Sequence, residues 1–194
     1  PAPSSRRGGV LRFSPQPRTQ ASPMELLAKL FGSPARLKML RLFVFNQDAS
    51  FTPGEVVART KLSKEVARRE LTELCSAGLL RKKGIHTSVR YQTNSRFEHL
   101  PALDIFIRQT TSVRPQIILG ALRRAGTLRL VALSGLFTGI LESQIDLLVV
   151  GDHVDERVLA GAVRHLEAEL GREIRYASFA TADFRYRLGI YDRL

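Results

Sequence analysis

The sequence predicts an α+β protein with a mostly helical N-terminal half and a C-terminal half that builds a small mixed sheet with helices. Three observations predict this class. Apolar residues recur at helical spacing through residues 24–77, and a basic, loosely alternating stretch typical of a strand hairpin follows them. From residue 114 onward, strand-like and helix-like stretches alternate. Most of the +12 net charge lies in the first half: residues 24–96 hold fourteen basic and six acidic side chains, whereas residues 97–194 hold twelve of each.

The first 23 residues are expected to form a disordered basic extension. They are rich in Pro, Ser, Gly and Arg, contain no acidic residue and lack hydrophobic periodicity. Such an arm could also contact DNA phosphates. A short amphipathic helix is predicted at residues 24–31. Ser33 and Pro34 then predict a second helix to about Phe45, with these apolar side chains turned inward: Leu37, Leu40, Leu42, Phe43 and Val44.

After a loop at residues 47–50, the stretch that begins at Thr52 predicts a helix, a tight turn, a second helix and a basic hairpin. The last strand of this hairpin is expected at residues 85–91. Thr52 can cap the first helix, and Glu55 can complete a capping box. Ser63 can cap the second helix, which is expected to end near residue 77. The inward side of the second helix carries Ala67, Leu71 and Leu74.

The pattern of residues 24–96 resembles the winged helix-turn-helix of transcription regulators. In that family the second helix enters the major groove, and the hairpin wing lies along the backbone or minor groove. The resemblance implies that the helix at residues 63–77 reads base edges and that basic wing residues contact phosphate. The residues implied in DNA binding are Ser63, Lys64, Arg68, Arg69, Thr72, Arg81, Lys82, Lys83 and Arg90. The alternative is a protein-interaction domain with a solvated basic helix.

Beyond the wing, residues 97–113 are expected to form a linker helix that could also serve dimerisation. Its apolar side carries Leu100, Leu103, Phe106 and Ile107. Pro115 can start the next helix, which Gly126 ends. Strands are predicted at residues 128–133, 145–150 and 172–180, a helix at residues 155–170, and a last helix from Thr181.

Residues 133–152, LSGLFTGILESQIDLLVVGD, resemble the nucleotidyltransferase superfamily. In that family a Gly-Ser turn holds nucleotide phosphates, and two carboxylates one residue apart bind two magnesium ions with a third carboxylate. In this chain Ser134 and Gly135 stand in the reverse order, and Gln144 replaces the first carboxylate. The third position offers only Glu173. The resemblance therefore predicts a catalytically degenerate domain.

Asp146 is the one carboxylate that matches the superfamily, within a resemblance that covers residues 114–194. It could be a relic held by hydrogen bonds of the turn, a ligand of one metal beside a bound nucleotide, or a residue of an active enzyme. The turn from Ser134 to Gly139 could offer backbone amides to a phosphate. The candidate ligand site therefore comprises Ser134, Gly135, Gly139 and Asp146.

The remaining residues indicate no other chemistry. The single cysteine, Cys75, permits no disulfide within the chain, which fits a reducing cytoplasm. The four histidines lack metal-ligand spacing, and no apolar run could span a bilayer. We expect a cytoplasmic DNA-binding transcription regulator with double-stranded DNA and a second copy of itself as partners, a nucleotide or small-molecule effector, and no catalytic residue, metal, cofactor or membrane partner. The alternative is an active magnesium-dependent nucleotidyltransferase whose winged helix binds DNA or autoregulates the enzyme.

Overall fold

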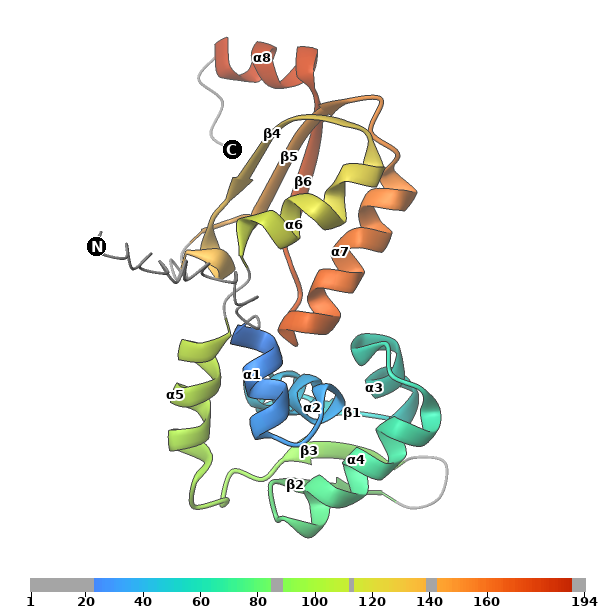
Figure 1. The fold of residues 1–194 in the computed structure, drawn as a ribbon, viewed down its shortest axis with the longest axis vertical. Coiled ribbons are helices and arrows are strands. Elements are labelled where there is room, and N and C mark those ends of the chain that lie inside the picture. Colours follow the sequence, from blue (N-terminus) through green and yellow to red (C-terminus); the bar gives the residue numbers. More distant parts are fainter. Residues whose placement is uncertain (1–22, 85–88, 112–113, 139–142, 190–194) are drawn as a thin grey trace, which may run out of the picture.

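The computed structural model describes residues 23–84, 89–111, 114–138 and 143–189. Within these ranges the chain has eight α-helices and two three-stranded sheets, which confirms the predicted α+β class. Figure 1 shows the N-terminal half below and the C-terminal half above. In the described part of the chain, no helix combines the length and the apolar character needed to cross a membrane. The predicted basic extension lies, apart from its last residue, outside the described residues.

The N-terminal half contains α1 (Pro23–Leu30), α2 (Pro34–Phe45), β1 (Ser50–Phe51), α3 (Pro53–Thr60), α4 (Lys64–Ser76), β2 (Leu80–Lys83), β3 (Arg90–Thr93) and α5 (Leu100–Thr110). Strand β3 lies between β1 and β2 and is antiparallel to both. The apolar residues predicted to face inward on α2 and α4 are all buried in one core. The predicted helix-turn-helix with a following strand hairpin is therefore confirmed.

The helices of this half begin at the predicted capping residues. The Thr52 hydroxyl accepts from the amide of Glu55, and the Glu55 carboxylate accepts from the amide of Thr52. The Ser63 hydroxyl accepts from the amide of Val66 at the start of α4. Lys61 forms the turn between α3 and α4 in the left-handed conformation, with φ of 56°. These short-range bonds set the boundaries of the helix-turn-helix.

Replacing Thr52 with alanine should lower the free energy of unfolding by about 1 kcal/mol, because the amide of Glu55 loses its acceptor. Urea denaturation followed by circular dichroism measures this loss. Thr72→Ala is the matched control, since the Thr72 hydroxyl donates only to the carbonyl of Arg68 within α4. Equal losses in the two variants would contradict the capping role.

The strands differ from the prediction at two boundaries. Ser50 was expected in a loop but belongs to β1, because a two-residue strand depends on pairing with β3 and carries no periodic pattern of its own. The strand expected at residues 85–91 is found as β3, which continues to Thr93; residues 85–88 lie outside the described residues. Thr93 is buried, and its hydroxyl donates to the carbonyl of Phe43, which attaches β3 to α2.

Helix α5 was predicted as a linker, but it packs on α2 as part of the N-terminal half. Leu100 and Ile107 are buried in the same core as α2 and α4. Phe106 was expected on the apolar side of this helix and is 37% exposed, with its ring edge-on to Phe31. The face of α5 that contacts the core is therefore narrower than its apolar face.

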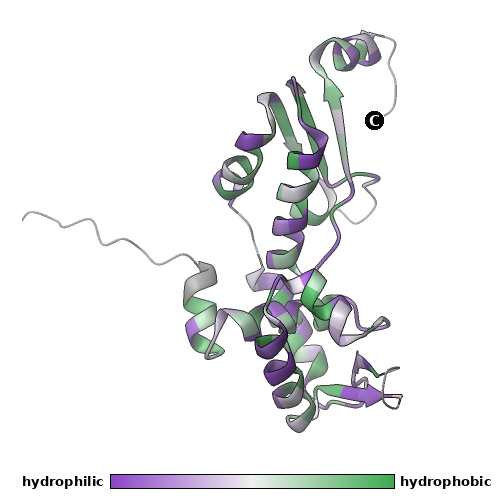
Figure 2. Cartoon of the chain, turned by 90° about the vertical axis from the view of Figure 1, so that its right-hand side faces the viewer, coloured by the Kyte–Doolittle hydropathy of each residue, from purple (hydrophilic) through white to green (hydrophobic). Residues whose placement is uncertain are grey.

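The C-terminal half contains α6 (Pro115–Leu122), the 3-10 turn η2 (Arg123–Ala125), β4 (Thr127–Leu133), the 3-10 turn η3 (Gly135–Phe137), β5 (Leu147–Asp152), α7 (Glu156–Leu170), β6 (Tyr176–Ala180) and α8 (Thr181–Gly189). Strand β5 is antiparallel to β4 and parallel to β6, so the sheet is mixed as predicted. Helices α6 and α7 cover one face of it (Figure 1). Its strands are largely hydrophobic (Figure 2). Strand β6 begins later than expected, because residues 172–175 contact other parts of the chain.

The C-terminal end of α7 docks onto α2 and joins the two halves. The Arg41 guanidinium donates from Nη1 to the carbonyl of Glu169 at 2.9 Å, and the Asn46 amide donates to the carbonyl of Gly171 at 2.8 Å. Lys38 pairs with the Glu169 carboxylate at 2.6 Å. A Cβ on Gly171 would lie 2.5 Å from the backbone of Arg41, so this contact requires glycine. Side chains of the N-terminal half therefore satisfy carbonyls that end α7.

Candidate functional site

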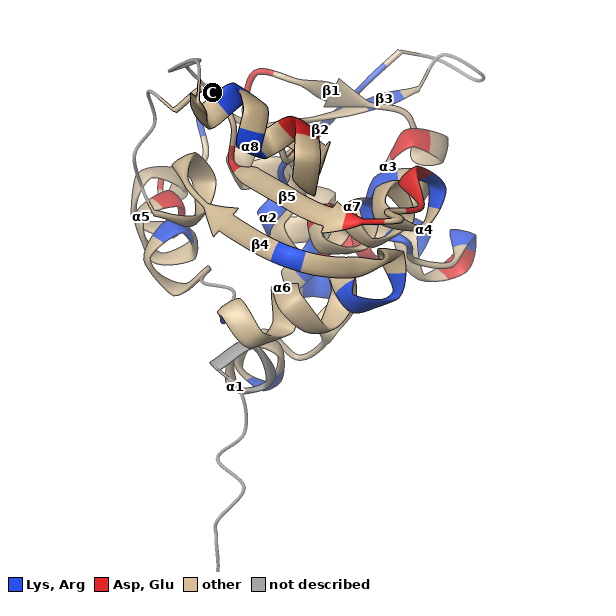
Figure 3. Ribbon diagram, turned by 90° about the horizontal axis from the view of Figure 1, so that it is seen from above, with Lys and Arg blue, Asp and Glu red and all other residues tan. Residues whose placement is uncertain are grey.

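Helix α4 divides into a buried side and an exposed side that carries the predicted reading residues. Ala67, Leu71 and Leu74 are buried, whereas the predicted reading residues on the other side are exposed: Ser63, Lys64, Arg68, Arg69 and Thr72. Basic and acidic residues along α3 and α4 are visible in Figure 3. The core thus fixes which side chains of α4 face outward.

The exposed side chains of α4 differ in whether they already pair with other residues of the protein. Glu70 is buried and pairs with Arg36 at 2.8 Å, and Arg69 approaches the same carboxylate at 3.8 Å. The side chains of Lys64 and Arg68 make no hydrogen bond or ion pair with the described residues. Lys64 and Arg68 are therefore the reading-helix cations most available to a partner.

The predicted wing residues fall into two groups. Arg81, Lys82 and Lys83 are exposed on β2, and Lys83 donates to the side chain of Gln92 across the hairpin. Arg90 instead donates to the Ser50 hydroxyl at 2.9 Å and to the Glu55 carboxylate at 3.2 Å. Hydrogen bonds from Thr52, assisted by Arg90, lower the pKa of Glu55. Arg90 thus connects the wing to α3. To contact phosphate, its guanidinium would have to keep these hydrogen bonds or exchange them for bonds to the phosphate.

A hollow that sequence reasoning missed lies between α3, α4 and the wing. It has a volume of about 320 Å³, and its lining includes Val57, Leu71 and Tyr91 together with Lys64 and Arg68. Burial raises the pKa of the Tyr91 hydroxyl. The hollow places apolar surface beside the two available cations. No local pattern reveals it, because its walls come from three separate elements.

Asp146 is held from several sides at the end of the turn before β5. Its carboxylate is 3% exposed and accepts from the amides of Leu136 at 2.8 Å and Arg175 at 3.0 Å. The Arg175 guanidinium adds two bonds, from Nε at 3.0 Å and from Nη2 at 2.9 Å. Burial opposes ionisation, but the bonds from Arg175 and Leu136 outweigh it and lower the pKa of Asp146. A guanidinium thus engages both oxygens of this carboxylate.

The candidate phosphate turn uses its amides within the protein. The amide of Leu136 donates to Asp146, and those of Phe137 and Thr138 donate to the carbonyls of Ser134 and Gly135. The Ser134 hydroxyl is 2.8 Å from the Ser143 hydroxyl. A Cβ on Gly135 would lie 2.1 Å from the Asp146 carboxylate, so this position requires glycine. Gly139, the fourth predicted ligand residue, lies outside the described residues.

The residues at this cleft do not fit a pair of magnesium ions. The cleft has a volume of about 310 Å³ and is lined by Leu136, Asp146, Arg172, Glu173 and Arg175. Gln144 is exposed, and the Glu173 carboxylate pairs with Arg59 at 2.6 Å. Within the described residues, no three His, Cys, Asp or Glu side chains are grouped as metal ligands. The cleft therefore presents guanidinium groups where two-metal chemistry needs carboxylates.

Comparison with protein-family models, with curated proteins and with solved structures found no match to this chain. The fold and the two sites define the class: an α+β protein that joins a helix-turn-helix with a basic wing to a mixed-sheet half. The buried acid of the second half is neutralised by arginine.

Proposed function

We propose that this protein is a DNA-binding transcription regulator that reads double-stranded DNA with α4 and contacts phosphate with its wing. The observation that supports this most is the exposure of Lys64 and Arg68 on a helix whose opposite side is locked in the core. An arginine on an exposed helix can pair with guanine, and wing lysines can contact phosphate. A single reading helix covers a half-site, so we propose a homodimer in the cytoplasm.

The C-terminal half serves sensing or assembly in this proposal rather than nucleotidyl transfer. Arg175 engages both oxygens of Asp146, which leaves no free carboxylate for a metal at that position. Incubation with magnesium and labelled nucleoside triphosphates tests this point. Transfer of label that Asp146→Asn abolishes without unfolding the protein would establish the enzyme instead.

Arg68→Ala should weaken binding to DNA that the protein selects from a random library by about 1–3 kcal/mol, because a bidentate contact to a base is lost. Fluorescence anisotropy with a labelled duplex measures this change. Arg157→Ala is the matched control, since Arg157 is an exposed arginine on α7 in the other half. Equal affinity of wild type and Arg68→Ala would exclude α4 as the reading helix.

Salt dependence separates DNA recognition from a protein-interaction role. If Arg81, Lys82 and Lys83 neutralise phosphates, the logarithm of the binding constant should fall linearly with the logarithm of salt, with a slope of about −0.9 per phosphate contact. Replacing all three with glutamine should flatten this slope. A slope near zero in the wild-type protein would contradict phosphate contacts by the wing.

A further inference from the structure

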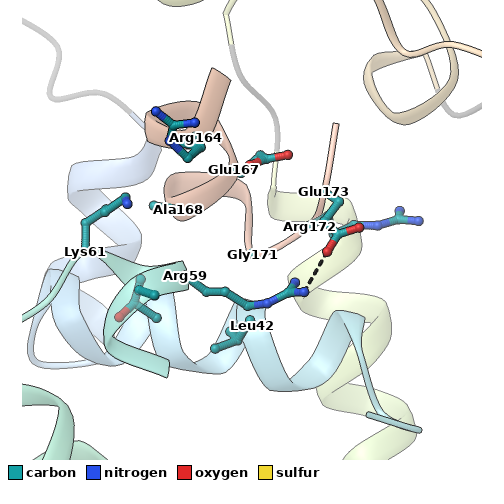
Figure 4. Close-up of a pocket in the computed structure, with 11 residues that line it drawn as sticks. Leu42, Arg59, Lys61, Arg164, Glu167, Ala168, Gly171, Arg172 and Glu173 are labelled. Carbon is teal, nitrogen blue, oxygen red and sulfur yellow. Dashed lines mark hydrogen bonds and ion pairs between the residues drawn. The ribbon is translucent and has the colours of Figure 1, made fainter. Parts of the chain in front are cut away.

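A second cavity lies at the junction of the two halves, away from the exposed side of α4. Its volume is about 300 Å³, and its walls come from α2, α3, α7 and the segment that follows α7 (Figure 4). The lining includes two small residues, Ala58 on α3 and Ala168 on α7. The contact of Gly171 with the backbone of Arg41 holds the walls together. The cavity is therefore part of the junction itself.

The lining of this cavity carries more positive than negative charge. It contains four basic side chains and two acidic ones: Arg59, Lys61, Arg164, Arg172, Glu167 and Glu173. Both acids are already engaged. Glu173 pairs with Arg59 at 2.6 Å, and Glu167 accepts from the amide of Ile174 at 2.9 Å. The lining therefore keeps an excess of two positive charges over its acids.

Lys61 and Arg164 carry the excess charge from opposite halves. Among the described residues, neither side chain has a hydrogen bond or an ion pair. Lys61 extends from the turn of the helix-turn-helix toward α7, which carries Arg164 (Figure 4). Arg172 also lines the cavity, and its guanidinium stacks on the ring of Phe45. Burial and the nearby Arg108 lower the pKa of Arg172.

We propose that this cavity binds a small molecule bearing phosphate groups, with Lys61 and Arg164 as its charged contacts from the two halves. A multivalent anion would neutralise cations that the protein leaves unpaired, and arginine suits phosphate geometry. The cavity suits a small ligand rather than a macromolecule, since its volume of about 300 Å³ lies at the lower end of small-molecule sites. Because Lys61 belongs to the turn before α4, the bound ligand links the C-terminal half to the reading helix. Its role as an effector rests on the proposed function, whereas binding itself does not.

Isothermal titration of the full chain with pyrophosphate, at constant ionic strength and without divalent cations, tests the site. We expect saturable binding with a dissociation constant on the order of millimolar or tighter. Lys61→Gln and Arg164→Gln should each weaken it about tenfold. Ala58→Leu should weaken binding at unchanged charge, because the larger side chain occupies part of the cavity. Arg157→Gln removes an exposed arginine of α7 outside the lining and should bind as wild type.

Two results would overturn the proposal. The first is no saturable binding by the wild type, or equal binding by wild type, Ala58→Leu and the two cation variants. The second result concerns DNA, whose phosphates the same cations could contact. Lys61→Gln and Arg164→Gln should leave DNA affinity within about twofold of wild type. A loss of DNA affinity as large as that of a wing variant would assign both cations to the DNA surface. The titration contains no DNA, so it stands even if DNA recognition fails.

Discussion

Replacing Arg41 with alanine should lower the free energy of unfolding by about 3–5 kcal/mol, because a large buried side chain and its hydrogen bonds are lost together. Arg41 is 1% exposed at the junction of the two halves. Its Nη1 donates to the carbonyl of Glu169, and its Nε donates to the Thr111 hydroxyl at 3.1 Å. The positive charge also lies at the C-terminal end of α7, where the helix dipole favours it. Alanine would leave these acceptors without a donor and open a cavity.

Differential scanning calorimetry tests this prediction and shows how the halves are coupled. Each half has its own apolar core, so weakening the junction should split one unfolding transition into two. Arg123→Ala is the matched control, because Arg123 is exposed in η2 away from this contact. A single transition at the wild-type temperature for Arg41→Ala would show that the junction contributes little.

The parts of the fold that were predictable depend on neighbours in sequence. Thr52 and Ser63 cap their helices through bonds to amides three residues later, so the signal lies within one turn. The helix predicted at residues 155–170 begins in the same way, since Asp155 accepts from the amides of Arg157 and Val158 at the start of α7. Helical periodicity identified the buried side of α4 for the same reason.

The parts that were not predictable depend on contacts between distant segments. Arg41 lies among inward-facing apolar residues of α2, and its bonds to Thr111 and to Glu169, 128 positions away, explain its burial. Strand β1 is too short to show a pattern without β3. The same limit applies to the cavity at the junction, whose cations come from α3, α7 and the segments that follow these two helices.

The sequence predicted more of the candidate site on α4 than of the site around Asp146. The exposed residues of α4 follow from its periodicity, and their role in reading DNA remains a prediction. At the second site the sequence identified Asp146 as the one carboxylate that matches the superfamily, but placed Arg175 only within the strand expected at residues 172–180. In the structure Arg175 precedes β6 and binds Asp146 with its amide and its side chain. The interpretation of Asp146 as a structural residue therefore gains a physical basis that spacing alone did not supply.

The segment that carries Arg175 also connects the Asp146 cleft to the junction of the two halves. Strand β6 begins four residues after Arg172, because the intervening segment lines both the Asp146 cleft and the junction cavity. Arg172 and Glu173 belong to both linings, and Glu173 holds Arg59 on α3. A change at Asp146 would thus reach the helix-turn-helix through a short, continuous segment.

Asp146→Ala should lower the free energy of unfolding by about 3–5 kcal/mol, whereas Arg175→Ala should cost clearly less. The difference arises because Asp146 is buried and serves the amides of Leu136 and Arg175, while the Arg175 side chain is 52% exposed and water can replace part of its interaction. Urea denaturation at neutral pH measures both losses. Asp183→Ala removes an exposed acid from the first turn of α8 and is the matched control.

The pH dependence of the same measurement identifies the ionised carboxylate as the cause. The pKa of Asp146 in the folded protein lies below its ordinary value of 3.8, so its stabilisation is fully present above that value. It is lost as the pH falls through the folded-state pKa, because the unfolded chain then binds its proton first. The wild type should therefore lose its advantage over Asp146→Ala in strongly acidic solution. A residue kept for metal chemistry would behave differently: its alanine variant would remain as stable as the wild type at every pH, and that result would remove the structural role assigned to Asp146.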